Sequence, residues 1–327
     1  MKAATGIAAA LAVGTLIAFG APLAAEAQDY PTRTITVVVP FPAGGPSDVV
    51  ARIVAEHMSR TLGQTMVIEN VTGAGGTIGS TRVATAAPDG YTILAGSMGS
   101  HVAAPVLTPN IKYGPGDFIP IGPTAHSPAV IVARKDFPAK DMREFVEYMK
   151  KNAANVKQAH GGIGASSHMA CLLFNTAIGV KPTLVAYRGT GPAMNDLIGG
   201  HVDTFCEQSV SVSRQVAGGV IKGYAVSAAE RLGALPNIPT AKEAGVDYQM
   251  SIWAGIFAPK GTPKAAIDKL AGALDKALDD GAVRKRIGDL GGSIPGKAER
   301  NPAAFDAYVK AEVARWAPIL KASAKTK

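Results

Sequence analysis

The chain is poor in cysteine and in aromatic residues. Cys171 and Cys206 are the only cysteines among 327 residues, which excludes a disulfide-rich scaffold. Cys171 lies in an apolar helical pattern and Cys206 ends an apolar strand pattern, so two buried thiols and one disulfide fit the sequence equally well. Aromatic residues make up 6% of the chain, and the basic residues are scattered along it. This composition argues against a nucleic-acid partner.

Patterns typical of metal and cofactor sites are also missing. The six histidines show no metal-ligand spacing with one another or with the cysteines, so we expect no metal site. The glycines from Gly73 to Gly79 follow a GxGxxxG spacing, which departs from the dinucleotide-binding pattern. We therefore expect no cofactor.

Long hydrophobic runs are confined to the N-terminus. The apolar stretch from Ile7 to Phe19 has about 13 residues, short of the ~20 that a membrane-spanning helix needs. It follows a charged start at Lys2 and precedes Ala25-Glu26-Ala27, the pattern of an export signal cleaved after Ala27. The formal net charge is +8, and removal of Lys2 and Glu26 with the signal leaves it unchanged. A positive field favours anionic partners.

The remaining ~300 residues exceed the usual size of a single hydrophobic core, which predicts two domains. Strand patterns alternate with helical patterns, so we expect an α/β fold in which each domain is a sheet flanked by helices. No glycine-, serine- or proline-rich linker separates the halves, which favours short crossover strands near residues 127–132 and 250–258. We expect one domain from residues 28–127 and 251–327, and a second domain from residues 128–250.

Glycine-rich turns between strands and helices are the most informative feature. In α/β units, ligands bind at the carboxyl ends of strands, where helix N-termini offer free N–H groups and a positive dipole end. Because carboxylates suit such positions, the recurrence of these turns predicts one shared anion pocket. The turns are Pro40–Asp48, Gly73–Thr77, Gly96–His101, Gly161–His168 and Tyr187–Pro192.

Three side chains suggest specific chemistry. Arg188 is the one strong cation on these turns and could hold a carboxylate through two hydrogen bonds, although it could equally be a solvated surface residue. Glu207 follows the strand expected at 202–206, where it could bind a ligand ammonium or hydroxyl, or be a surface acid. Ser97 lies in Ala95–Gly99, which resembles a nucleophile elbow, so an exported serine hydrolase is an alternative function. The last histidine, His201, does not fit the order of that catalytic triad well.

Seven segments in order resemble the Bug family of periplasmic receptors, the solute-binding components of tripartite tricarboxylate transporters. They are Tyr30–Arg52, Val67–Gly79, Ala86–Ser97, Gly164–Phe174, Val185–Asp203, Leu235–Gly245 and Trp253–Pro263. The resemblance implies a two-domain periplasmic binding-protein fold, type II-like, with the ligand clamped between the domains. It also implies a monomer without enzymatic activity, which delivers a dicarboxylate, tricarboxylate, amino acid or aromatic acid to integral membrane transporter subunits. A sensory role toward a signalling receptor is a further alternative.

The resemblance also implies a set of ligand-binding residues, carried over position by position. Pro46 departs from the common pattern, because proline offers no N–H to a carboxylate. The implied residues are Phe41, Gly44, Gly45, Ser47, Asp48, Ser97, Ser100, Ala165, Ser166, Ser167, His168, Arg188, Gly189 and Glu207.

Overall fold

The computed structural model describes residues 30–325, and the chain from Pro31 onward forms one compact unit. The expected export signal lies outside the described residues. Within residues 30–325, every helix is too short or too polar to cross a membrane.

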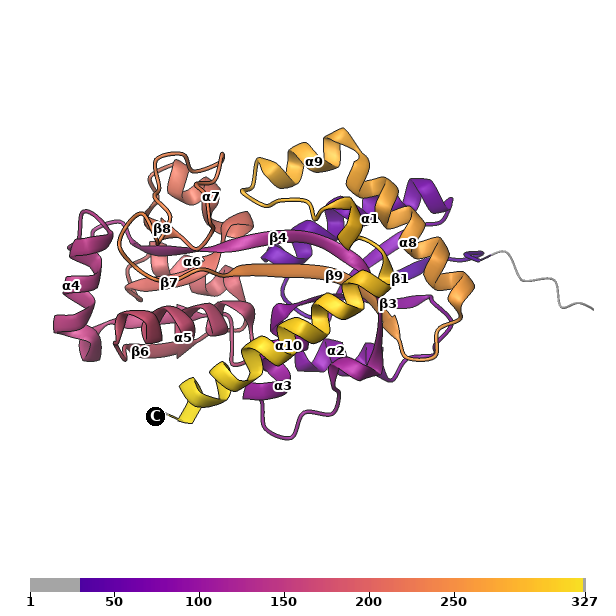
Figure 1. Cartoon of the computed structure of the whole chain (residues 1–327), viewed down its shortest axis with the longest axis horizontal. Helices are drawn as coiled ribbons and strands as arrows, with labels where there is room; N and C mark the ends of the chain where they lie inside the picture. The colour runs from indigo at the N-terminus through magenta and orange to yellow at the C-terminus, as the bar shows by residue number, and fades with distance from the viewer. Residues whose placement is uncertain (1–29, 326–327) are drawn as a thin grey trace, which may run out of the picture. The chain divides into compact units, whose positions relative to one another are not determined.

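The described residues form a mixed α/β structure (Figure 1). The strands are β1 Ile35–Val39, β2 Met66–Asn70, β3 Thr92–Ser97, β4 Phe118–Arg134, β5 Lys157–His160, β6 Thr183–Ala186, β7 Thr204–Gln208, β8 Ile221–Val226 and β9 Ser251–Pro259. The helices are α1 Pro46–Leu62, α2 Thr77–Ala84, α3 Ala104–Leu107, α4 Met142–Asn152, α5 Ser166–Ile178, α6 Thr190–Ile198, α7 Ser209–Ala217, α8 Lys264–Asp279, α9 Gly281–Gly288 and α10 Pro302–Lys325. The α/β class expected from the sequence is confirmed.

The strands form two groups that share β4. The strand order is β2-β1-β3-β9-β4-β7-β5-β6, and β8 also pairs with β4. Strands β1, β2 and β3 pair in parallel, as do β5, β6 and β7, whereas every pairing of β4 and β9 is antiparallel. We call β1, β2, β3, β9 and the first part of β4 the first strand group. The second strand group contains β5, β6, β7, β8 and the rest of β4.

Strand β4 changes partners in its middle. Residues Phe118 to Pro128 pair with β9, and residues Ala129 to Arg134 pair with β7 and β8. The two long strands β4 and β9 run side by side (Figure 1). The polypeptide therefore passes from the first group to the second along β4 without a loop.

Strand β4 and some of the helices differ from the sequence-based expectation. A short crossover strand was expected near residues 127–132, whereas β4 begins at Phe118 and includes prolines at 120, 123 and 128, which are unfavourable within a strand. The strand tolerates them by shifting register after Pro120 and after Pro123. Helix α7 was not expected, because SVSVSRQV alternates like a strand, and the short, polar α9 carries little helical periodicity.

The larger hydrophobic core joins both strand groups. Trp253 and Phe257 of β9 are fully buried and contact Phe305 of α10, with ring centroids 5.7 and 5.3 Å away. The same core continues to Cys171 of α5 and Cys206 of β7, which are both buried free thiols. The sequence left a disulfide open, and the structure has these two cysteines unbridged.

Candidate functional site

The turn between β1 and α1 is held in place by Asp48. Its carboxylate accepts hydrogen bonds from the Gly44 backbone N–H at 2.9 Å, from Arg52 Nε at 2.9 Å and from Asn70 Nδ2 at 2.8 Å. Asn70 Nδ2 also donates to the Phe41 carbonyl at 3.0 Å. Burial alone would raise the pKa of Asp48, but these three hydrogen bonds hold it below its usual value. Asp48 is therefore an ionised brace of the turn.

The second strand group contributes the turn that precedes α5. Gly164 has a φ of +85°, a conformation that side-chain-bearing residues rarely adopt. Ser167 Oγ accepts a hydrogen bond from the Gly161 N–H at 3.0 Å, which closes the turn. Ser166 Oγ accepts a hydrogen bond from the Gly99 N–H at 3.0 Å. Because Gly99 follows β3, this last bond links the two strand groups.

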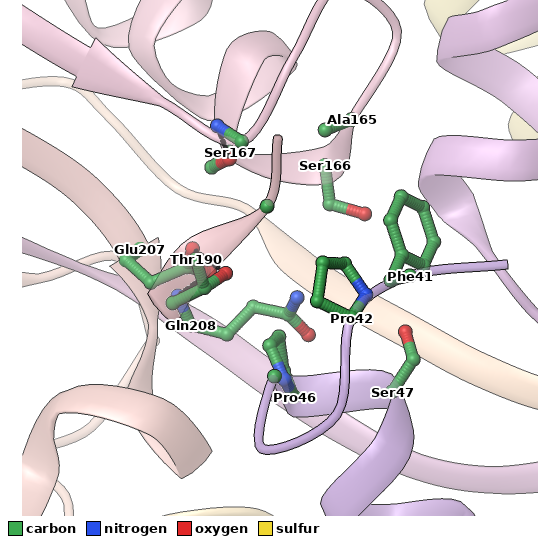
Figure 2. Close-up of a pocket in the computed structure, with 13 residues that line it drawn as sticks. Phe41, Pro42, Pro46, Ser47, Ala165, Ser166, Ser167, Thr190, Glu207 and Gln208 are labelled. Carbon is green, nitrogen blue, oxygen red and sulfur yellow. Dashed lines mark hydrogen bonds between the residues drawn. The ribbon is translucent and has the colours of Figure 1, made fainter. Parts of the chain in front are cut away.

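A cavity that is partly open to solvent lies between these turns. Figure 2 shows Phe41, Pro42, Pro46 and Ser47 on one side and the residues of the second strand group on the other. The lining residues are Phe41, Pro42, Gly45, Pro46, Ser47, Gly161, Ala165, Ser166, Ser167, Gly189, Thr190, Glu207 and Gln208.

Four of the described helices begin at this cavity. Their N-cap residues are Gly45 for α1, Ala165 for α5, Gly189 for α6 and Gln208 for α7, and none of these residues caps its helix with its own side chain. In α7 the Val210 N–H donates to Ser127 Oγ at 3.3 Å, so the uncapped ends are those of α1, α5 and α6. The first N–H groups of a helix lack intrahelical acceptors and carry the positive end of the helix dipole. Pro46 removes one donor from α1, so Ser47 is the first residue of that helix with an N–H. The cavity is therefore suited to an anion.

Among residues 30–325, Glu207 is the one ionisable side chain that lines the cavity. The sequence placed it after a strand, but β7 continues to Gln208, so Glu207 lies within β7 with 1% of its surface exposed. Its Oε2 accepts a hydrogen bond from the Thr190 hydroxyl at 2.6 Å, and its Oε1 accepts one from the Gln208 N–H at 2.7 Å. Burial raises the pKa of Glu207 to about 7, and hydrogen bonds from Thr190 and from the backbone and side chain of Gln208 offset part of that effect.

Arg188 lies beside a second, more open hollow, which we call the outer hollow. It shares Phe41, Pro42, Gly161 and Gly189 with the cavity. A Cβ on Gly189 would lie 2.4 Å from Pro42 Cγ, so the two turns approach closely where the linings overlap. Arg188 is exposed to solvent.

The structure brings eight of the fourteen expected residues to the cavity. The eight are Phe41, Gly45, Ser47, Ala165, Ser166, Ser167, Gly189 and Glu207. Gly44, Asp48, Ser97, Ser100, His168 and Arg188 do not line it. Sequence reasoning missed five lining residues, which are Pro42, Pro46, Gly161, Thr190 and Gln208. The first four lie on turns that it had selected, and Thr190 carries a detectable signal because it is a polar residue at a helix start. Gln208 was missed because α7, which follows it, was not expected.

Ser97 and Ser100 are buried beneath the turn that follows β3. Ser100 Oγ accepts from the Ser97 N–H at 2.9 Å and donates to the Ser97 carbonyl at 3.0 Å, so its hydroxyl stabilises this turn. Within the described part of the chain, Ser97 Oγ has no hydrogen-bond partner. His101 Nδ1 lies 3.0 Å from Ser100 Oγ, and its ring stacks on Phe257. Burial lowers the pKa of His101 to about 3, which keeps the ring neutral.

The contacts of His168 are those of a residue that stabilises the turn before α5. His168 stacks on His160 with ring centroids 4.3 Å apart, and its Nδ1 accepts a hydrogen bond from the Gly164 N–H at 3.3 Å. Among residues 30–325, no three His, Cys, Asp or Glu side chains are grouped so that they could hold a metal ion.

An α/β fold with a cavity between two strand groups is the arrangement of a periplasmic solute-binding protein, and solved structures of that class match it. MatC from Rhodopseudomonas palustris, solved with bound malate, is 44% identical, with a TM-score of 0.86 over 89% of this chain and 100% of that one. The periplasmic binding protein BugD is 45% identical, with a TM-score of 0.86 over 90% and 98% of the two chains. A further R. palustris protein, solved with adipate, is 30% identical, with a TM-score of 0.86 over 90% and 98%.

Residues 50–324 match the family model described as the tripartite tricarboxylate transporter family receptor. The chain belongs to this family, whose members are solute-binding proteins. The two-domain periplasmic binding-protein fold and the Bug-family resemblance are thereby confirmed.

The burial of Glu207 predicts a pH-dependent stability difference between the wild type and Glu207→Gln. The folded wild type binds a proton at Glu207 up to about pH 7, whereas the unfolded chain releases it near pH 4.5, so wild-type stability falls as the pH rises between these values. Raising the pH from 5 to 8 should therefore favour Glu207→Gln over the wild type by roughly 2 to 3 kcal/mol in unfolding free energy.

Urea unfolding without ligand at both pH values measures this difference. Glu147→Gln, at an exposed position of α4, serves as the control for the loss of one carboxylate. An equal difference between Glu207→Gln and the wild type at both pH values would contradict the burial effect.

Proposed function

We propose that this protein is an exported receptor that captures a small organic carboxylate and delivers it to the membrane subunits of a tripartite tricarboxylate-type transporter. It acts as a monomer in the periplasm, after cleavage of the signal near Ala27, and catalyses no reaction. The ligand-binding residues are those that line the cavity, with Arg188 at its approach. The malate and adipate complexes of its relatives support a dicarboxylate as the ligand.

The observation that carries this proposal is the meeting of three uncapped helix N-termini at one cavity. Helices α1, α5 and α6 direct unpaired backbone N–H groups and positive dipole ends toward it. The serine hydroxyls of Ser47, Ser166 and Ser167 add donors that do not depend on pH. A carboxylate offers several acceptor sites and a negative charge, so it matches both features.

The proposed mechanism is closure of two domains about the strands that they share. We place the first domain at residues 28–127 and 251–327, and the second at residues 128–250, so that the boundary follows the change of partners at Pro128 in β4. Contacts between the turns are close at two glycines. A Cβ on Gly75 would lie 1.8 Å from the Ile163 carbonyl oxygen, and one on Gly189 would meet Pro42. These contacts belong to the closed state, in which the carboxylate is buried.

The surroundings of Ser97 do not favour the serine-hydrolase alternative. A nucleophilic serine needs a base within hydrogen-bond reach and access to substrate. Ser97 is 1% exposed, and the nearby His101 contacts Ser100 instead.

A ligand panel tests the proposed function. Purified protein lacking residues 1–27 should gain thermal stability with malate, adipate or a related di- or tricarboxylate, because a ligand at 100-fold excess over its Kd adds about 2.7 kcal/mol. The dimethyl ester of the active compound is the control and should give no shift. The absence of a thermal shift with every carboxylate, amino acid and aromatic acid would contradict the proposal.

Substitution of Gly75 tests closure separately from ligand contact, because Gly75 does not line the cavity. Gly75→Ala should weaken ligand affinity at least tenfold, since its Cβ would overlap the Ile163 carbonyl in the closed state. Gly63→Ala is a matched control, because Gly63 has the same φ of +66° but no atom within 4 Å of its Cβ position. Calorimetric titration measures the ligand affinity of both variants. Equal affinities in the two variants would rule out this contact as part of closure.

Arg188→Ala tests the role of the outer hollow. Because Arg188 is exposed beside the path to the cavity, its removal should slow ligand association several-fold at low salt and reduce the salt dependence of association. Lys150→Ala on α4 is the control for net charge. Stopped-flow kinetics measures the association and dissociation rate constants of the ligand separately. A loss of about 1.5 to 3 kcal/mol that resides in dissociation would instead indicate a direct charged hydrogen bond.

A further inference from the structure

The helix starts at the cavity favour an anion, but the ionisable side chain that lines it has the same charge sign as a carboxylate ligand. Of the thirteen lining residues, twelve are neutral and the remaining one is Glu207. No cation lies among them, and the groups that hydrogen-bond to Glu207 are neutral: the Thr190 hydroxyl, the Gln208 N–H and the Gln208 side chain. If Glu207 stayed ionised, a bound carboxylate would face a second negative charge in a desolvated site.

The hydrogen bond between Thr190 and Glu207 adds to this conflict. An ionised carboxylate only accepts hydrogen bonds, so the Thr190 hydroxyl must donate its proton to Glu207 Oε2. Thr190 then presents oxygen lone pairs, and no donor, to the cavity that it lines. A proton on Oε2 removes both obstacles, because Glu207 becomes neutral and can donate to Thr190.

We propose that carboxylate binding is coupled to the uptake of one proton by Glu207, which reverses the Glu207–Thr190 hydrogen bond and turns the Thr190 hydroxyl toward the ligand. The proton comes from solvent and forms an O–H bond at Oε2. That O–H donates to Thr190 Oγ1, and the Thr190 O–H donates to a ligand oxygen. Oε1 continues to accept from the Gln208 N–H. This inference rests on the proposed carboxylate ligand, and it makes Glu207 and Thr190 residues that determine ligand charge.

The other titratable groups near the cavity are not suited to take up this proton. Asp48 of α1 is tied to Arg52 and held ionised. Burial raises the pKa of Cys206, the neighbour of Glu207 in β7, so this thiol stays neutral. His160 of β5 and His168 of α5 stack on each other and do not line the cavity. The pKa of Glu207, raised to about 7, allows proton uptake near neutral pH.

The test is calorimetric titration of the mature protein with malate between pH 6 and 8.5, in buffers with different ionisation enthalpies. For the wild type, Kd should rise up to tenfold per pH unit above pH 7, and binding at pH 8 should take up close to one proton per ligand. Glu207→Gln mimics the protonated acid, so it should bind malate with a Kd that does not depend on pH and without proton uptake.

Two variants at position 190 test the hydroxyl. Thr190→Ser retains the O–H and should keep the wild-type pH profile, whereas Thr190→Val should bind malate about tenfold more weakly at pH 6. Circular dichroism checks that both variants are folded. Equal affinity of Thr190→Val and the wild type at pH 6 would remove Thr190 from the proposal.

The outcomes separate this inference from the proposed function. Absence of binding by any carboxylate at any pH contradicts the proposed function itself. Binding with a flat pH profile in the wild type, or a pH dependence that persists in Glu207→Gln, overturns only the coupling. Tighter binding of aspartate than of malate, lost in Glu207→Gln and without proton uptake, would show that an ionised Glu207 holds a ligand ammonium.

Discussion

The need to satisfy backbone N–H groups at helix starts is the constraint on which the site depends. Helices α1, α5 and α6 begin at one cavity and lack side-chain caps, so their first donors require an acceptor from elsewhere. The glycine-rich turns allow the backbone to approach that place closely from both strand groups. Strand β4, which pairs with β9 and then with β7 and β8, keeps the two groups in one sheet while giving each its own turns.

Two buried acids near the cavity illustrate how surroundings decide the role of a carboxylate. Asp48 accepts hydrogen bonds from Gly44, Arg52 and Asn70, and this set of donors keeps it ionised despite burial. Glu207 accepts hydrogen bonds only from neutral donors of Thr190 and Gln208, and burial raises its pKa to about 7. Asp48 therefore shapes the turn between β1 and α1, whereas Glu207 can change its charge at neutral pH. The same carboxylate group stabilises a turn as Asp48 and can accept a proton as Glu207.

The sequence predicted much of the fold because its local patterns agree with the tertiary structure. The glycine-rich turns expected at Pro40–Asp48 and Gly161–His168 do lead into helices α1 and α5 and contribute residues to the cavity. The sequence-based prediction failed for the first part of β4, where register shifts in the pairing with β9 accommodate the prolines. It also could not separate the buried Ser97 and Ser100 from the serines of α5, because burial under a turn leaves no local signature.

A crystal structure of the mature protein with its tightest carboxylate ligand tests the central claim most directly. The account predicts a ligand carboxylate in the cavity, within hydrogen-bond distance of N–H groups at the starts of α1, α5 or α6, with Thr190 and Glu207 beside it. A ligand that lies in the outer hollow and is held by Arg188, with the three helix starts bound only to water, would contradict it.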